Sequence, residues 1–389
     1  MNTASIRNVC LTFLFALFLS ACGDSDQAPT QETTDGDAAQ SETQAEAQAE
    51  AQSETETVTW RFALEEVEGS VQDAYAQEFK RRIEERSDGA INIEIYPYGA
   101  LGTSSQLTEM AQSGGIELAF ASPGHLADLI PEVGIFTLHF VLSESNQVNR
   151  AVLSDERVYG LFQPLYNEQD LQLLDIIPEG WMVWSADKPL RTLEDFNNFK
   201  IRTMTSPILV ESYRAYGANP TPMPYSEVYS GLQLGQIDGQ VNPIFAIEEM
   251  SFYEEQDVLT SGRHAQFIST LAASKQWFDS LSNEQRQMVI NVRDELVDWI
   301  DEEQIRYNEE RLQTILDAGG TEWVELTEEE RQAFREASMG VRDTYVEQAG
   351  DSGQEILDTL LELIEQAESG SGSDEETESG MESDGQNNG

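Results

Sequence analysis

The residues best suited to hold a charged small molecule lie in the segment 200–245. Arg202 closes a short apolar run, a proline-rich loop follows at 220–224, and Asn242 precedes Pro243. The planar fork of an arginine can hold a carboxylate in two parallel hydrogen bonds, and an asparagine amide can donate to the same group. Taken alone, a single arginine in so acidic a chain favours a surface salt bridge, and an asparagine before a proline favours a turn. From these residues alone, both interpretations stay open.

Acidic and aromatic side chains elsewhere are further candidates. A strand expected at 57–64 ends in the acidic run 65–68. Because the carboxyl ends of strands in an α/β sheet face the ligand crevice, one of these acids is expected at its mouth. Tyr225 and Phe267 could form aromatic walls, although aromatic side chains more often belong to a core.

Sequence motifs for catalysis are absent. The chain holds no Gly-x-Ser-x-Gly elbow, no P-loop, no Gly-x-Gly-x-x-Gly turn and no His-Glu-x-x-His pair. The three histidines, His125, His139 and His264, are not spaced as metal ligands. Carboxylates are so frequent that a pair of them is expected by chance. We therefore expect a binding protein with no enzymatic activity, no metal and no cofactor.

The charge of the chain limits its partners. The net charge is −50, from 72 acidic and 22 basic residues. The segments 23–57 and 368–389 hold ten and seven acids and no base, and their composition predicts disorder. Nucleic acid is not an expected partner, since phosphate binding needs a basic face. We favour adaptation to high salt, which screens self-repulsion, over a merely acidic secreted protein.

The N-terminus is typical of an exported lipoprotein. Arg7 precedes an apolar run, 9–19, that is too short to span a bilayer comfortably, and small residues stand before Cys22. Leu-Ser-Ala-Cys at 19–22 resembles the bacterial lipobox, in which the cysteine is lipidated and becomes the mature N-terminus. The alternative is an ordinary signal peptide that carries a cysteine. We expect an extracytoplasmic protein, in the periplasm or at the cell surface, held to the membrane by a lipid on Cys22.

The rest of the chain is too long for one compact core and suits two lobes. From residue 57 to 121, strands and helices alternate, which predicts an α/β lobe with a largely parallel sheet. Strands at 171–178 and 181–185 follow, and the second lobe is expected to begin near Met182. The predicted division is a signal peptide at 1–21, a tether at 22–57, lobe I at 58–181 and 270–309, lobe II at 182–269 and 310–367, and a tail at 368–389.

One helix is predicted to be far longer than a small lobe. The segment 282–319 is helical in pattern, has no internal proline or glycine, and ends at Gly319-Gly320. Such a helix would span roughly 50 Å. A final helical region, 327–366, is expected to return to lobe II. A coiled coil is the alternative for the long helix, but no strict heptad is sustained in its sequence.

The segment 200–245 resembles the signature of the solute-binding proteins of TRAP transporters (the DctP family), with its run Lys-Ile-Arg, its proline-rich loop and its Ile-Asp-Gly-Gln. The runs 61–80, 121–124, 178–180 and 186–189 also resemble the ectoine-binding TRAP proteins of halophilic bacteria. The resemblance implies an α/β, two-lobe, periplasmic-binding-protein-like (flytrap) fold with a long helix across both lobes. It also implies a small carboxylate-bearing solute as ligand and TRAP membrane permease subunits as partners.

The same resemblance assigns roles to individual residues. It places a glutamate for the cationic ring of ectoine at Glu66, and a carboxylate clamp at Arg202 and Asn242. Aromatic rings surround the solute in those relatives. The ligand-binding positions it implies here are Glu66, His125, Arg202, Tyr225, Asn242, Phe245 and Phe267.

This chain departs from that aromatic cage. The relatives' phenylalanine falls at His125, and their tryptophans fall at Tyr225 and Ala246. Dicarboxylate-binding relatives carry a second arginine where this chain has Met182, which cannot balance a second anionic charge. Ectoine or a similar compatible solute is therefore favoured. A C4-dicarboxylate, keto-acid or sugar-acid receptor stays open, as do an enzyme on the same frame and a tethered sensor domain.

Overall fold

The computed structural model describes residues 57–381, and side chains up to residue 370. The predicted signal peptide, Cys22 and most of the predicted tether lie outside these residues. The first part that is described alternates strands and helices as the sequence predicts: β1 (Val58–Ala63), α2 (Val71–Arg86), β2 (Ile91–Tyr96), α3 (Ser104–Gln112) and β3 (Leu118–Phe120). β1 pairs in parallel with both β2 and β3, so this part of the sheet is parallel.

Local sequence explains where helix α2 begins and which face of it is buried. Helix α2 begins after Ser70, whose side chain accepts a hydrogen bond from the N–H of Asp73, as an N-cap does. Tyr75, Phe79 and Ile83 then follow at helical spacing, and all three are buried. The helix thereby covers the alternating apolar face of β1 and leaves the acidic loop 64–69 at the end of the strand.

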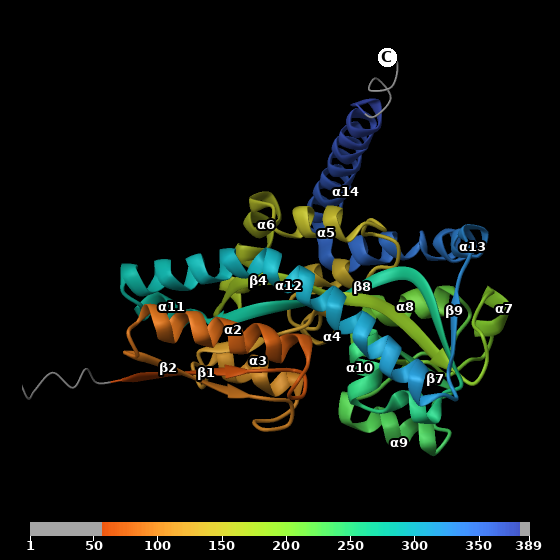
Figure 1. The fold of residues 1–389 in the computed structure, drawn as a ribbon, viewed down its shortest axis with the longest axis horizontal. Coiled ribbons are helices and arrows are strands. Elements are labelled where there is room, and N and C mark those ends of the chain that lie inside the picture. Colours follow the sequence, from red (N-terminus) through yellow and green to blue (C-terminus); the bar gives the residue numbers. More distant parts are fainter. Residues whose placement is uncertain (1–56, 382–389) are drawn as a thin grey trace, which may run out of the picture. The chain divides into compact units, whose positions relative to one another are not determined.

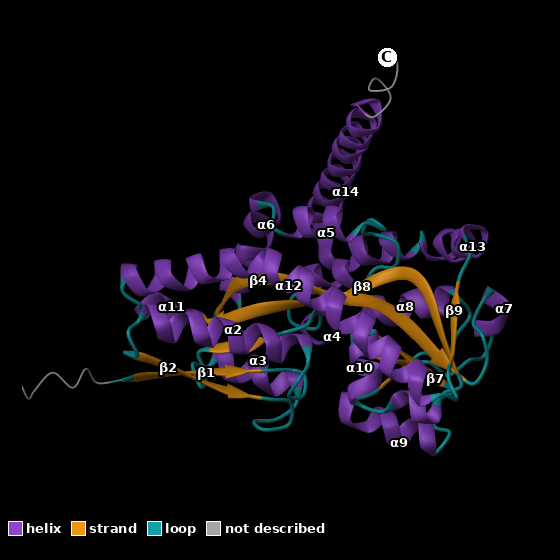
Figure 2. Cartoon of the chain, in the orientation of Figure 1, coloured by secondary structure: helices purple, strands orange, loops and turns teal. Residues whose placement is uncertain are grey.

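Two long strands join the two halves of the sheet (Figures 1 and 2). β4 (Leu171–Ala186) and β8 (Val258–Ser274) pair antiparallel along most of their length. The sheet order is β2-β1-β3-β8-β4-β7, with β7 (Gly239–Asn242) antiparallel to β4 and β9 (Glu322–Glu325) parallel to β8. The whole sheet is therefore mixed, and not largely parallel.

The sequence predicts two strands, 171–178 and 181–185, where the structure has the single strand β4. The pairing shifts register between Pro178 and Gly180, so the strand passes this point with a bulge and continues. Gly180 has a φ of +139°, and a Cβ there would lie 2.5 Å from Nδ2 of Asn308. A glycine is favoured because any other residue would collide with the Asn308 side chain of the neighbouring helix and would be strained at this positive φ.

That neighbour is the predicted long helix, which is confirmed as α12 (Asn283–Ala318). It begins with a capping box between Ser282 and Gln285 and ends before Gly319. It packs against α2, against β4 and against α10 (Ile244–Glu249). One helix thus contacts elements from both halves of the sheet.

The remaining elements surround this frame. They are α4 (Pro123–Leu126), η1 (Pro131–Thr137), α5 (Asn146–Leu153), α6 (Glu156–Glu168), α7 (Leu193–Phe196), β5 (Arg202–Thr203), α8 (Pro207–Ala215), β6 (Thr221–Pro222), η2 (Tyr225–Glu227), α9 (Val228–Gln233), η3 (Phe252–Glu255), α11 (Lys275–Ser280), α13 (Glu328–Ser338) and α14 (Val341–Met381). β5 and β6 form a separate parallel pair beside the end of the main sheet.

The C-terminal helix differs from the sequence-based expectation. Tyr345, Ile356 and Leu360 of α14 share one hydrophobic core with Val152 of α5 and Phe162 of α6, in the part assigned to lobe I. Apolar residues at 356, 360 and 363 form the stripe that makes this contact. The helix also continues to Met381, past the predicted boundary at 367. The division into lobes and tails stays a prediction.

Candidate functional site

One pocket brings together six of the seven predicted ligand-binding side chains. The empty space between its walls, including the part open to solvent, is about 400 Å³, and it lies where the loop after β1 faces β5, β7 and β8. The six predicted residues that line it are Glu66, His125, Arg202, Tyr225, Asn242 and Phe267. Residues separated by as much as two hundred positions in the sequence thus converge on one small space.

Arg202 is held by the proline-rich loop. The pairing of β5 with β6 sets Arg202 opposite Thr221, and the guanidinium Nε and Nη2 donate to the carbonyl of Met223 at 3.1 and 2.9 Å. The side chain is 1% exposed, and burial lowers the pKa of Arg202 to about 10. Among the described residues, none accepts a hydrogen bond from Nη1. A buried guanidinium with a free donor edge suits a carboxylate.

Asn242 stands at the end of β7, beside β4. Its amide Nδ2 donates to Oε1 of Gln240, and Nε2 of Gln240 donates to Ser185 Oγ at 2.9 Å. This chain of buried amides fixes the orientation of Asn242, which is 5% exposed. The amide is therefore a pre-oriented polar group that lines the same pocket as Arg202.

Glu66 faces the pocket from the loop after β1. Its Oε2 accepts a hydrogen bond from the backbone N–H of Gln72 at 3.3 Å, and the Gln72 side chain donates to Oε1 of Glu179 at 3.2 Å. Burial, together with the negative charge of Glu179, raises the pKa of the Glu66 carboxyl well above its usual range. A cation placed beside Glu66 would stabilise its charged form.

The ring-bearing walls are Tyr225, Phe267 and His125. The hydroxyl of Tyr225 donates to Oε1 of Glu249 at 3.2 Å, and burial raises the pKa of that carboxyl to about 8. Nδ1 of His125 lies 3.5 Å from the hydroxyl of Thr205. Burial, and then the charge of Arg202, lower the pKa of His125 to about 4, so at neutral pH its ring is an uncharged flat surface.

Phe245 is the predicted residue that does not line the pocket. It is 1% exposed and packs in the hydrophobic core with residues of β1 and α12, because the first turn of α10 directs it away from the pocket. Ala246, one position later, lines the pocket instead.

Sequence reasoning also missed lining residues. Glu65, Ser104, Ser122 and Met204 contribute to the pocket wall. Glu65 belongs to the acidic run 65–68. In a regular strand, adjacent side chains point to opposite sides, so this rule would place only one of Glu65 and Glu66 at the pocket. The strand ends at Ala63, so this rule no longer holds at residues 65 and 66.

The pocket therefore combines a cationic guanidinium with carboxyl groups that a bound cation would ionise. Arg202 and Asn242 can hold an anionic group, and the carboxyls that follow β1 can hold a cationic one. Such an arrangement is complementary to a small zwitterion.

Comparison with known proteins identifies the family. Residues 62–348 match the DctP family, described as bacterial extracellular solute-binding protein, family 7. The chain belongs to this family. Members of the DctP family are the solute-binding proteins of TRAP transporters, which bind small solutes and work with membrane permease subunits.

Two of the DctP-family relatives to which this chain is similar are named for ectoine. The ectoine-binding periplasmic protein TeaA of Halomonas elongata is 40% identical over 301 residues, 77% of this chain and 88% of TeaA. The ectoine/5-hydroxyectoine-binding periplasmic protein UehA of Ruegeria pomeroyi is 38% identical over the same shares of each chain. A TRAP periplasmic solute binding protein of Marinobacter aquaeolei VT8, solved in an apo open state, has a TM-score of 0.75 and 48% identity, covering 78% of this chain and 100% of that one.

These findings confirm the fold class and the family predicted from the sequence. The TeaA and UehA relatives are periplasmic by name. Between residues 57 and 381, no helix is both long and apolar enough to cross a membrane.

Proposed function

We propose that this TRAP solute-binding protein captures a zwitterionic compatible solute, ectoine or a close analogue, and delivers it unchanged to the permease. The observation that carries the proposal is the placement of Arg202 and Glu66 in one pocket. An arginine with a free donor edge suits the carboxylate of the solute, and a buried carboxyl suits its cationic ring. The names of TeaA and UehA support ectoine as the starting hypothesis.

The charge of the pocket favours a zwitterion over a dicarboxylate. Two carboxyl groups, Glu65 and Glu66, line the pocket with one arginine, Arg202. Among the described residues that line the pocket, Arg202 is the single lysine or arginine, so a second carboxylate on the solute would be desolvated without a cation to pair with, which is costly. A C4-dicarboxylate or another organic acid is therefore the weaker candidate.

The altered walls are compatible with a cation. His125 offers a flat ring that its lowered pKa keeps uncharged, so it does not repel the ring of ectoine. Tyr225 and Phe267 supply two aromatic surfaces for cation–π contact. Ala246 supplies no ring, which leaves room for a substituent that a tryptophan would exclude.

A ligand screen tests the proposal directly. The full chain is heated with ectoine, 5-hydroxyectoine, glycine betaine, succinate and galactonate, each in excess, and the midpoint of unfolding is measured. A ligand present at a hundred times its Kd adds about 2.7 kcal/mol to the free energy of unfolding. We expect the largest shift with ectoine or 5-hydroxyectoine, and recovery of the solute intact by mass spectrometry. A larger shift with succinate than with either ectoine would contradict the proposal.

We also propose that the protein is a lipoprotein anchored through Cys22, outside the cytoplasm. The lipobox-like sequence at 19–22 supports this. Replacing Cys22 with serine should release the protein from the membrane fraction. A mass spectrum showing an unmodified mature N-terminus at another residue would contradict the anchor but leave the solute proposal intact.

A further inference from the structure

A second carboxyl group, that of Glu65, lies in the wall of the pocket beside Glu66. Its side chain is fixed at one end, because Oε2 accepts a hydrogen bond from the backbone N–H of Ser122 at 2.7 Å. The backbone N–H of Glu65 donates to Oε1 of Gln72 at 2.9 Å. Glu65 is 6% exposed, so it is held in one orientation within the protein.

The other oxygen of this carboxyl has no partner. Within the described part of the chain, no group meets hydrogen-bond geometry at Oε1 of Glu65, although the atom is buried. The hydroxyls of Ser104 and Ser122, which also line the pocket, lie near this carboxyl and lower its pKa against the effect of burial. Leaving a buried charged acceptor unsatisfied costs more than an ordinary hydrogen bond contributes. Natural proteins rarely keep such a group without a reason, and a pocket-lining position offers one: the missing donor comes with the ligand.

We propose that Glu65 is a second specificity-determining residue, whose free oxygen accepts a hydrogen bond from an N–H of the cationic part of the solute. The site then selects a protonated amine or amidine over a quaternary ammonium. The inference rests on the proposed function, since it takes the solute to be a zwitterion whose carboxylate is bound at Arg202.

The selection follows from hydrogen-bond chemistry. Both kinds of cation can balance the charge of Glu66. A quaternary ammonium has no N–H, however, so it leaves Oε1 of Glu65 without a hydrogen-bond donor. A site built around a buried acceptor rejects an analogue that lacks the matching donor. A hydrogen bond to a charged group is worth enough to change Kd about 10- to 100-fold.

The experiment compares two solutes on four proteins. Calorimetry at pH 8 measures Kd for ectoine, which has N–H donors, and for glycine betaine, which has none. The pH lies above the value of about 7 to which burial raises the pKa of Glu65, so this carboxyl is ionised. The proteins are the full wild-type chain, Glu65→Gln, Glu66→Gln and Glu68→Gln. Glu68 is the matched control, because it is exposed and lies in the same loop.

We expect Glu65→Gln to weaken ectoine binding about 10- to 100-fold and betaine binding by about threefold or less. Glu66→Gln should weaken both solutes, because both are cations, and Glu68→Gln neither. The midpoint of unfolding without solute should stay the same or rise in Glu65→Gln, since the amide still accepts from Ser122 and the unpaired charge is gone.

A merely structural role gives the opposite pattern. If Glu65→Gln lowers the midpoint without solute and weakens both solutes equally, or leaves ectoine binding unchanged, Glu65 does not select the cation and this inference is overturned alone. If the wild-type chain binds neither zwitterion, the proposed function fails and the inference fails with it. The wild-type measurement therefore separates the two.

Discussion

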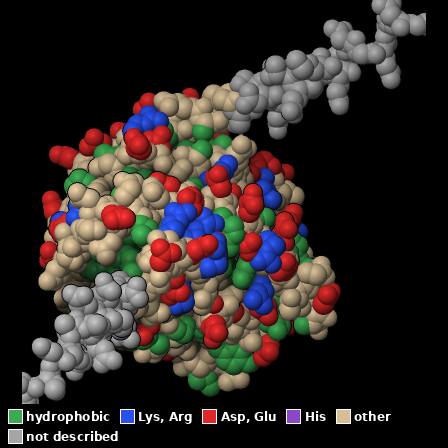
Figure 3. Space-filling view, turned by 60° about the vertical axis from the view of Figure 1, so that its left-hand side comes forward, with side chains coloured by type: hydrophobic (Ala, Val, Ile, Leu, Met, Phe, Trp, Pro, Cys, Tyr) green, Lys and Arg blue, Asp and Glu red, His purple; other side chains and the backbone are tan. Residues whose placement is uncertain are grey.

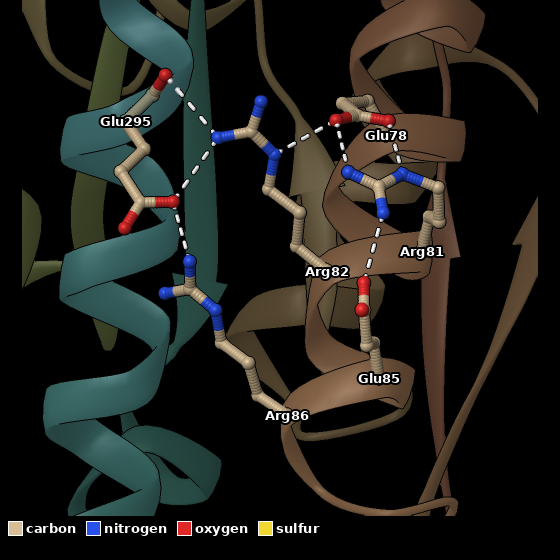
Figure 4. Close-up of polar contacts among 6 residues, drawn as sticks. All are labelled: Glu78, Arg81, Arg82, Glu85, Arg86 and Glu295. Atoms are coloured by element: carbon tan, nitrogen blue, oxygen red, sulfur yellow. Dashed lines mark hydrogen bonds and ion pairs between the residues drawn. The ribbon is translucent and has the colours of Figure 1, made fainter.

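Charged side chains in the pocket and on the surface between α2 and α12 are arranged in opposite ways. On the surface, Arg82 donates to Glu78 at 2.8 Å and to Glu295 at 3.1 Å, and Arg86 also pairs with Glu295 (Figure 4). Arg81 pairs with Glu78 and Glu85. Blue and red side chains also lie interspersed, among tan and green ones, on the face in Figure 3. Every charge drawn in this network has an opposite partner.

In the pocket, charged side chains have few hydrogen-bond or ion-pair partners within the protein. Arg202 bonds one carbonyl, and Glu65 keeps a buried oxygen that meets no donor of a described residue in hydrogen-bond geometry. Exposed ion pairs contribute little to stability, whereas unpaired buried charges cost a great deal. Charged groups of the surface network therefore find their partners within the protein, whereas we expect those of the pocket to find theirs in a bound solute. Substitutions should therefore act on binding in the pocket and only weakly on stability at the surface.

The largest effect is expected from Arg202→Ala. The substitution leaves the carboxylate of the solute desolvated without its main partner, which should cost about 2–5 kcal/mol of binding free energy. Arg202→Lys should restore little of this, because an ammonium cannot reproduce the two-pronged geometry. Isothermal calorimetry with the best solute from the screen measures both variants.

Arg214→Ala is the matched control for Arg202. Arg214 is exposed and pairs with Glu211 three residues earlier on α8, as the surface network does. Its loss should leave Kd unchanged. Normal binding by Arg202→Ala would show that the carboxylate lies elsewhere and would remove the contrast between the two regions.

Glu66→Gln should have the next largest effect, and its sign matters more than its size. With a zwitterion, loss of the charge facing the cation should weaken binding by about 1.5–3 kcal/mol. With a dicarboxylate, loss of a repulsive charge should leave binding unchanged or tighten it. Measured on the solute that gives the largest thermal shift, tighter binding by Glu66→Gln would exclude the compatible solute.

Much of this could be predicted from the sequence, and the limits have physical causes. The long helix α12 can be predicted from the capping residues at its N-terminus and the glycines that follow its C-terminus, which are local signals. The continuity of β4 is not, because Pro178 and Gly180 read as a break until β8 pairs across them. The packing of α14 on α5 and α6 depends on contacts between residues some two hundred positions apart, which periodicity does not specify.

The site shows the same limit. Arg202 and Asn242 could be named from their segment, whereas Glu65 could not, because its role depends on an oxygen that is left unpaired in three dimensions. The resemblance assigns Ala246 to the aromatic cage and also adds its neighbour Phe245 to the ligand-binding residues, but the turn of α10 places only Ala246 at the pocket.

Without solute, stability should depend on pH in a way the pocket explains. Burial raises the pKa of Glu65 to about 7 and of Glu249 to about 8, so the folded protein holds protons that the unfolded chain has released. Stability from these groups is present below the unfolded pKa near 4.5 and is lost as the pH rises through 7 and 8. The free energy of unfolding should therefore fall by about 1–2 kcal/mol between pH 6.5 and 8, since neighbouring carboxyls that repel one another do not all ionise.

Between pH 6.5 and 8, buried histidines do not add an opposite dependence of stability on pH. Burial lowers the pKa of His139 to about 3 and of His125 to about 4, so stability from the neutral rings is complete above pH 6.5 and is lost only as the pH falls below it. Urea unfolding at pH 6.5 and pH 8 measures the difference, and Glu249→Gln should reduce it. A free energy of unfolding that rises over this interval would show that Glu65 and Glu249 are already stabilised in their ionised forms.

The smallest effect is expected at the surface network, from Glu295→Gln. Glu295 is the residue of α12 that links Arg82 and Arg86 of α2, and its side chain is 47% exposed. Exposed pairs of this kind are worth about 0.2–1 kcal/mol and are screened by salt, so the loss in unfolding free energy should be near 1 kcal/mol or less at low ionic strength. Chemical unfolding of wild type and variant with urea, with and without about 1 M sodium chloride, should show the difference shrinking as the Debye length falls to about 3 Å. The affinity for the solute should not change. A loss well above 2 kcal/mol, or one that persists in salt, would mean that this network behaves like the buried charges of the pocket.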